Sequence, residues 1–104
     1  MKIDNFTILI HPNAEKEFID SVEWYELLRK NLGVEFSSEI EKVLLLIEHN
    51  PFIFSIKNKV FREAVVKKFP YLIVFTINKI NKTIYVISIF NTTRNPKLKY
   101  ILKP

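Results

Sequence analysis

The chain has 104 residues, of which 48% are hydrophobic, and its formal net charge is +5. The apolar content predicts a packed fold rather than a disordered chain, and the length predicts a single domain over residues 1–104. One glycine excludes the glycine-rich loops that bind phosphates and dinucleotides, and the lack of cysteine excludes disulfides and thiolate metal sites. With only two histidines, we expect neither a metal site nor a cofactor. The positive charge favours an anionic partner, either nucleic acid or an acidic protein.

The first half of the chain predicts a strand followed by two helices. Residues 6–10 are rich in β-forming side chains, and Pro12 suits the first turn of the helix that follows. Apolar residues then recur at three- and four-residue steps, with Gly33 as the expected stop between two amphipathic helices. The second helix should end near Pro51, and so short a connection predicts an antiparallel helix hairpin.

The same periodicity divides the helix residues into a buried stripe and a solvent-exposed face. Together with two residues of the last strand, the stripes predict a core of Phe18, Val22, Tyr25, Ile40, Val43, Leu44, Ile47, Ile87 and Ile89. The glutamates fall elsewhere around the helices, and we expect them only to be solvated: Glu15, Glu17, Glu23, Glu35, Glu39 and Glu41.

The second half of the chain predicts a loop over residues 52–58 and then strands over 60–66, 72–77 and 84–90. Short connections between these strands predict antiparallel pairing, and the nearly continuous apolar run of the last strand predicts a central position. The fold is therefore expected to be α+β, with the order β-α-α-β-β-β. The helix hairpin should pack on one face of a mainly antiparallel four-stranded sheet.

No signal peptide or membrane span is predicted. The N-terminal residues lack an apolar core, and the longest apolar run is 43–47, so we expect a cytoplasmic protein.

Two short motifs in the second half, Phe69-Pro70-Tyr71 and Arg94-Asn95-Pro96, are similar to motifs of the RelE/ParE family of bacterial toxins. The order of elements also resembles that family over the whole chain, although Asn91 stands where many relatives carry histidine. The resemblance implies the toxin of a type II toxin–antitoxin system. It also implies a cognate acidic antitoxin as partner, in a toxin–antitoxin hetero-oligomer.

Members of that family act in two ways, and the sequence leaves both open. Many cleave mRNA on the ribosome without a metal, through attack of the ribose 2′-OH on the adjacent phosphate to give a 2′,3′-cyclic phosphate. Such a reaction needs a proton acceptor, a proton donor and cations for the phosphate. Other members inhibit DNA gyrase and cleave nothing. The ribonuclease is slightly favoured by the basic residues near strand ends; a gyrase inhibitor or an inactive antitoxin-binding homologue is the alternative.

The resemblance places the candidate catalytic residues at Arg62, Arg94, Lys57 and Lys59. Arg62 and Arg94 would hold the phosphate, and we expect an antiparallel sheet to bring them close together. The two lysines would transfer protons, because the amide of Asn91 does not titrate. Candidate RNA-binding residues are Lys67, Lys68, Asn91 and Tyr100. The alternatives for these residues are an ordinary surface ion pair for Arg62, solvated charge for the lysines, and packing for Tyr100.

Overall fold

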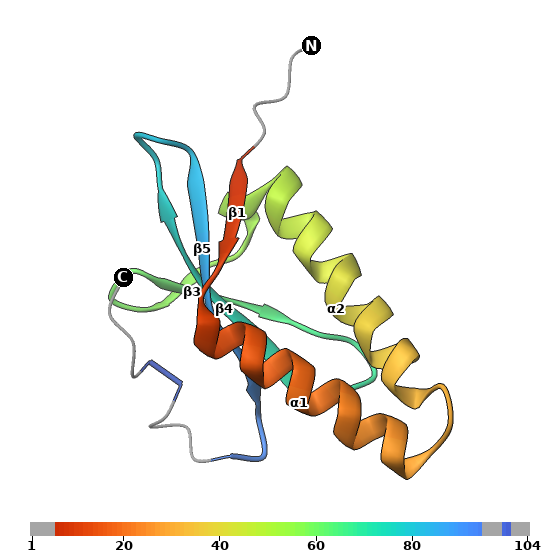
Figure 1. The fold of residues 1–104 in the computed structure, drawn as a ribbon. Coiled ribbons are helices and arrows are strands. Elements are labelled where there is room, and N and C mark those ends of the chain that lie inside the picture. Colours follow the sequence, from red (N-terminus) through yellow and green to blue (C-terminus); the bar gives the residue numbers. More distant parts are fainter. Residues whose placement is uncertain (1–5, 95–98, 101–104) are drawn as a thin grey trace.

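The structure is a computed structural model that describes residues 6–94 and 99–100. In this part of the chain, two helices pack on one face of a five-stranded sheet (Figure 1). The elements are β1 (Thr7–Ile10), α1 (Pro12–Leu28), α2 (Leu32–His49), a short 3-10 helix η1 (Pro51–Ile53), β2 (Ile56–Asn58), β3 (Phe61–Val65), β4 (Tyr71–Asn78) and β5 (Thr83–Asn91). The predicted α+β fold class is confirmed.

The strands follow the order β1-β5-β4-β3-β2, with β1 parallel to β5 and every other pair antiparallel. The apolar strand β5 is central, as predicted. The prediction of four strands was wrong, because β2 lies within the segment expected to be a loop. Only three residues long, β2 is too short to show an alternating pattern, and it is defined by its pairing with β3.

The residue with a left-handed backbone between the two helices is not the glycine that was expected to end the first helix. Helix α1 ends at Leu28, and Asn31 takes the left-handed conformation (φ 71°) that had been expected of Gly33. Gly33 instead lies in the first turn of α2, where a Cβ atom would stand 2.6 Å from the carbonyl oxygen of Val22. Glycine is therefore required there because the helix backbones approach closely, rather than because a helix must stop.

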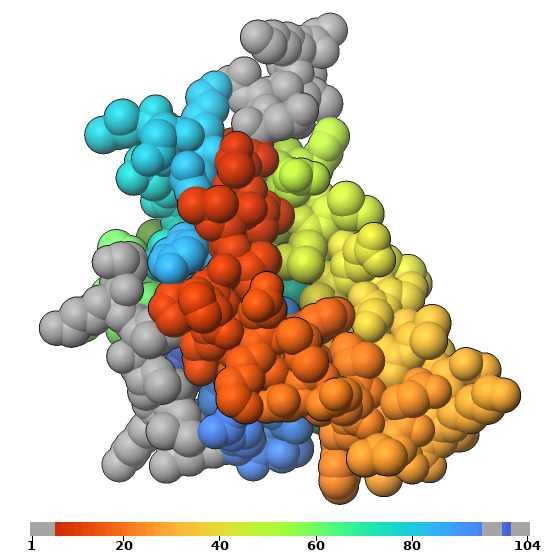
Figure 2. Space-filling view, viewed as in Figure 1, coloured from red at the N-terminus to blue at the C-terminus, as the bar shows by residue number. Residues whose placement is uncertain are grey.

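Apolar side chains form one core between the helices and the sheet and a smaller cluster on the opposite sheet face. Figure 2 shows α1 and α2 side by side along the helix hairpin, with β1 and part of the β4–β5 region visible beside them. The buried or packed residues of the first core include all the predicted ones except Ile87. Ile87 lies in the second cluster with Phe61, Val74 and Phe90, on the opposite face from Ile89, because the register of β4 and β5 shifts between Val74 and Phe75. Such a bulge changes the face on which later residues point.

Candidate functional site

Helix α1 continues the hydrogen bonding of β1 along the edge of β5. Strand β1 accompanies β5 only as far as Val86, whose carbonyl accepts a hydrogen bond from the His11 amide at 2.8 Å. Beyond it, Asn13 Nδ2 donates to the Ile87 carbonyl at 3.4 Å, and Glu17 Oε1 accepts from the Ile89 amide at 3.0 Å. Side chains of a helix thus satisfy backbone groups that a longer β1 would otherwise pair.

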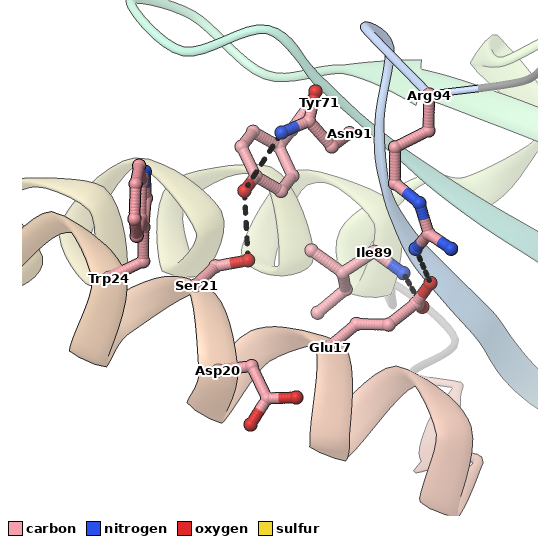
Figure 3. Close-up of a pocket in the computed structure, with 8 residues that line it drawn as sticks. All are labelled: Glu17, Asp20, Ser21, Trp24, Tyr71, Ile89, Asn91 and Arg94. Atoms are coloured by element: carbon pink, nitrogen blue, oxygen red, sulfur yellow. Dashed lines mark hydrogen bonds and ion pairs between the residues drawn. The ribbon is translucent and has the colours of Figure 1, made fainter.

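A pocket of about 290 Å³ opens where α1 passes the ends of β4 and β5 (Figure 3). It is lined by Glu17, Asp20, Ser21, Trp24, Tyr71, Ile89, Asn91 and Arg94. The Tyr71 hydroxyl donates to Ser21 Oγ at 2.8 Å and accepts from Asn91 Nδ2 at 3.4 Å. In Figure 3, Arg94 reaches down toward Glu17, and the carboxylate of Asp20 points away from the other polar groups.

Glu17 is the most constrained polar residue of this pocket. Its carboxylate accepts from Ser88 Oγ at 2.9 Å as well as from the Ile89 amide, and it faces Arg94 Nη1 at 3.8 Å. Burial raises the pKa of Glu17, against the opposing effects of these hydrogen bonds and of the arginine. The expectation that Glu17 is only solvated was wrong, because its side chain is just 17% exposed.

Asn91 stands at the position where many RelE/ParE relatives carry histidine, and its side chain forms hydrogen bonds within the turn that follows β5. Its Oδ1 accepts hydrogen bonds from the amide and the hydroxyl of Thr93, at 2.9 and 2.7 Å. The side chain therefore stabilises the turn that follows β5. Burial and the neighbouring Tyr71 raise the pKa of Tyr25 to about 12.

The other predicted arginine, Arg62, lies near the start of β3, opposite Phe75 in the middle of β4 and away from the pocket. Its Nη1 donates to the Phe54 carbonyl at 2.7 Å, and its guanidinium carbon lies 5.4 Å from the centre of the Phe52 ring. Lys79, in the turn between β4 and β5, lies 5.6 Å from the same ring. Lys57 is in β2 and is exposed, as is Lys59 in the turn before β3.

The structure does not bring Arg62 and Arg94 together. Arg62 is opposite Phe75 in the register of β3 and β4, whereas Asn91, just before Arg94, is opposite Tyr71. These two rows are four residues apart along β4, or about 13 Å at about 3.3 Å per residue. The sequence placed both arginines near strand ends correctly but did not indicate which end of the sheet each would occupy.

The candidate RNA-binding residues also lie in different parts of the structure. Lys67 and Lys68 follow β3 at the same end as Asn91, where the Thr92 amide donates to the Pro70 carbonyl at 2.7 Å. Lys68 lies 3.6 Å from the carboxylate of Glu39. Tyr100 packs against Phe61 at 5.2 Å between ring centres, in the cluster on the face away from the helices.

Glu39 is a second glutamate for which the prediction of solvation was wrong. Its side chain is 8% exposed and lies 3.0 Å from Lys42 and 3.6 Å from Lys68. A hydrogen bond from Lys42, together with the charges of both lysines, lowers the pKa of Glu39. Each of the two misjudged glutamates lies at the border of its helix's buried stripe, which was the available signal in the sequence.

Neither helix is long and apolar enough to cross a membrane, among the residues that the structure describes. The same residues contain no group of three or more histidine, aspartate or glutamate side chains arranged to hold a metal ion.

Comparison with known proteins identifies a shared fold. No protein-family model and no curated protein matches the chain. Among solved structures, it is similar to a chain of the chromosomal ParDE TA system from P. aeruginosa, with a TM-score of 0.72 and 11% sequence identity. The match covers 83% of this chain and 95% of that chain. Nearly the whole of that neighbour is therefore represented in the fold described above.

Proposed function

We propose that this protein is the toxin of a type II toxin–antitoxin pair, acts in the cytoplasm and is neutralised by an acidic antitoxin. The likeness of fold to a chain of a ParDE system, over nearly the full length of that chain, carries the proposal. Two motifs that resemble those of RelE/ParE toxins, Phe69-Pro70-Tyr71 and Arg94-Asn95-Pro96, support it independently. A net charge of +5 suits association with an acidic partner, because complementary charge accelerates encounter.

For the mode of action, the geometry supports binding of a protein target, as in gyrase-inhibiting toxins, better than cleavage of RNA. Cleavage requires a base, an acid and phosphate-binding cations within reach of one phosphodiester. The row of Arg62 and the row of Asn91, three residues before Arg94, instead lie four residues apart along β4, at roughly 3.3 Å per residue, and each arginine has its own partner. Arg94 faces Glu17, so a phosphate would have to compete with a carboxylate already present.

A metal-independent mRNA endoribonuclease is the second candidate, and one observation favours it. Arg62 and Lys79 both lie beside the half-exposed ring of Phe52, and the exposed Lys57 and Lys59 lie in and just after the neighbouring strand β2. Cations beside an aromatic ring are suited to single-stranded RNA, which binds through phosphates and stacked bases. In this case a lysine would have to transfer protons, because Asn91 does not titrate.

The deciding experiment is to induce the protein in cells and to follow mRNA integrity by primer extension alongside DNA supercoiling. The proposal predicts intact mRNA with a loss of supercoiling. It also predicts that the double variant Lys57→Gln/Lys59→Gln remains toxic. Site-specific cuts in mRNA that disappear in this double variant would instead establish the ribonuclease. Growth that is unaffected by the folded protein would identify an inactive homologue and overturn both.

A second measurement tests the partner. Co-expression with an adjacent acidic reading frame should restore growth and yield a stable complex on co-purification. The affinity should fall as salt increases, since opposite charges are screened. A toxic protein that no adjacent product neutralises would contradict the proposed pairing.

A further inference from the structure

Exposed apolar side chains gather around the turn between β4 and β5. Ile80, within this turn, is 98% exposed, and Leu9 and Val60 are each about half exposed. All three side chains line one open hollow of about 780 Å³. In Figure 1 the turn lies at the end of the sheet away from the tip of the helix hairpin. We call these three residues, together with Phe52 and Lys79, the distal surface.

The turn that carries Ile80 is held by its own hydrogen bonds. Asn78 Oδ1 accepts from the amides of Ile80 and Asn81, at 3.0 and 3.2 Å. Beside it, Lys79 Nζ lies 5.6 Å from the centre of the Phe52 ring. The isoleucine is therefore directed outward by an ordered turn, so that covering it requires little further loss of conformational freedom.

Positive charge accompanies these apolar side chains, without carboxylates among them. Residues 50–62 and 76–86, which supply most of the distal surface, contain no aspartate or glutamate. Glu63, which follows the first segment, is already paired with Lys99 at 2.9 Å. The basic residues of the two segments are Lys57, Lys59, Arg62, Lys79 and Lys82. Among the described residues, Lys57, Lys59 and Lys79 form no ion pair, so their charge is available to an anionic partner.

The tip of the helix hairpin provides a contrast. Leu27 is 85% exposed there, but the exposed carboxylates of Glu23, Glu26 and Glu35 lie in the same part of the hairpin. These carboxylates would repel an anionic surface. Of these two exposed apolar regions, only the distal surface combines aliphatic side chains with uncompensated positive charge.

We infer that the distal surface docks on an anionic lipid bilayer. Ile80 and Val60 would enter the interfacial region, and Lys57, Lys59 and Lys79 would contact the phosphate groups of the lipids. A bilayer can surround a side chain that projects from a turn, because its interface deforms around the inserted group. Peripheral docking of this kind needs no membrane-spanning helix.

Other occupants fit the distal surface less well. Single-stranded RNA binds by stacking its bases on aromatic rings, whereas the projecting side chains of Leu9, Val60 and Ile80 are aliphatic. A second copy of this chain would bring the same lysines together, and like charges repel.

This inference goes beyond the proposed function and does not depend on it, because neither an antitoxin nor a target takes part. It adds a place of action. Part of the protein would be held at a membrane surface, with Lys57 and Lys59 turned toward the lipid headgroups.

The first test measures co-sedimentation of the purified full chain with vesicles of phosphatidylcholine alone, or of phosphatidylcholine with an equal part of phosphatidylglycerol. Binding to the mixed vesicles should be at least about tenfold stronger and should fall as salt increases. Ile80→Ser should weaken it at least about tenfold, because an aliphatic side chain no longer leaves water, whereas Leu27→Ser on the hairpin should change it by less than about twofold.

Charge variants test the lysines separately. Lys57→Gln/Lys79→Gln should weaken binding to the mixed vesicles at least about tenfold, since each lysine near an anionic surface contributes about fivefold. Lys30→Gln/Lys67→Gln is the matched control, because it removes the same charge from exposed positions elsewhere and should change binding by less than about threefold. Circular dichroism checks that every variant folds.

Tryptophan fluorescence reports which face meets the lipid. The only tryptophan of the chain, Trp24, lies in α1. Its emission should not change when mixed vesicles are added to the wild-type protein. Ile80→Trp places a second indole on the distal surface, and this variant should show a shift of its emission to shorter wavelength, because the new ring leaves water.

The outcomes decide the inference without reference to toxicity. Absence of binding to the mixed vesicles would overturn it, and so would binding that the Ile80 and lysine variants leave unchanged. A shift in the emission of Trp24 would show that another face meets the lipid. Self-association that Ile80→Ser abolishes, or binding of a single-stranded RNA probe that Ile80→Ser weakens, in protein that ignores vesicles, would identify a different occupant and overturn the inference. Each of these results leaves the toxin proposal standing.

Discussion

The basic residues at the two ends of the sheet have different kinds of partner. At the pocket end, Arg94 faces Glu17 and Lys68 faces Glu39, so positive charge is offset by carboxylates from the helices. At the other end, Arg62 contacts a backbone carbonyl and the ring of Phe52. A ring or a carbonyl orients a cation without neutralising it, whereas a carboxylate cancels its charge. Apart from the exposed Lys67, available positive charge is therefore concentrated where β2, β3 and the β4–β5 turn meet, although basic residues occur at both ends of the sheet.

The largest effect is expected from removing the carboxylate at the pocket end. Glu17→Ala would leave the Ile89 amide and the nearly buried Ser88 hydroxyl without their acceptor. Leaving such groups unsatisfied should lower the free energy of unfolding by about 2 to 3 kcal/mol, measured by urea denaturation. Glu15→Ala, on the exposed face of the same helix, is the control and should change it by less than about 0.5 kcal/mol. Equal stability of the two variants would mean that Glu17 does not hold α1 to β5.

A smaller loss is expected at the opposite end. Arg62→Ala removes the 2.7 Å hydrogen bond to Phe54 and the contact with the Phe52 ring. Together these predict a loss of about 1 to 2 kcal/mol in the free energy of unfolding, again from urea denaturation. Lys57→Ala, in the neighbouring strand, should cost less than about 0.5 kcal/mol. Equal stability of the two variants would mean that the contacts of Arg62 with Phe54 and Phe52 do not stabilise the fold, so that its guanidinium would be available to bind an anion.

The smallest expected effect is on the pH dependence of stability, which should differ in sign between Glu17 and Glu39. The pKa of Glu17 is raised from its ordinary 4.5, so its contribution to stability is present below that value and lost as pH rises through the raised pKa. The pKa of Glu39 is lowered, so its contribution is present above 4.5 and lost as pH falls through the lowered pKa.

Thermal unfolding from about pH 3 to pH 7 measures these contributions against Glu17→Gln and Glu39→Gln, which cannot titrate. With rising pH, wild type should lose stability relative to the Glu17 variant and gain stability relative to the Glu39 variant. Slopes of the same sign would show that burial does not dominate at Glu17, or that Lys42 and Lys68 do not hold Glu39 in its charged form.

The sequence by itself predicted the elements that carry a strong local pattern. The helix stripes and the alternating or apolar strands depend on neighbours three, four or two residues away, so their periods identify the two helices, the last three strands and the α+β class. It failed where the pattern is short or the cause is distant. Strand β2 has only three residues, and the need for glycine at position 33 arises from Val22 on the other helix.

The partners of Glu17, Arg62 and Arg94 were decided by the tertiary structure. Glu17 meets Ser88, Ile89 and Arg94 because α1 crosses the edge of β5 just where β1 ends. Arg62 and Arg94 are separated because the register sets Arg62 four residues along β4 from Asn91, although both arginines lie near strand ends. Composition and local pattern determine how many charges a surface carries. The partners of Glu17 lie more than 70 positions away in the sequence, and no local period encodes such contacts.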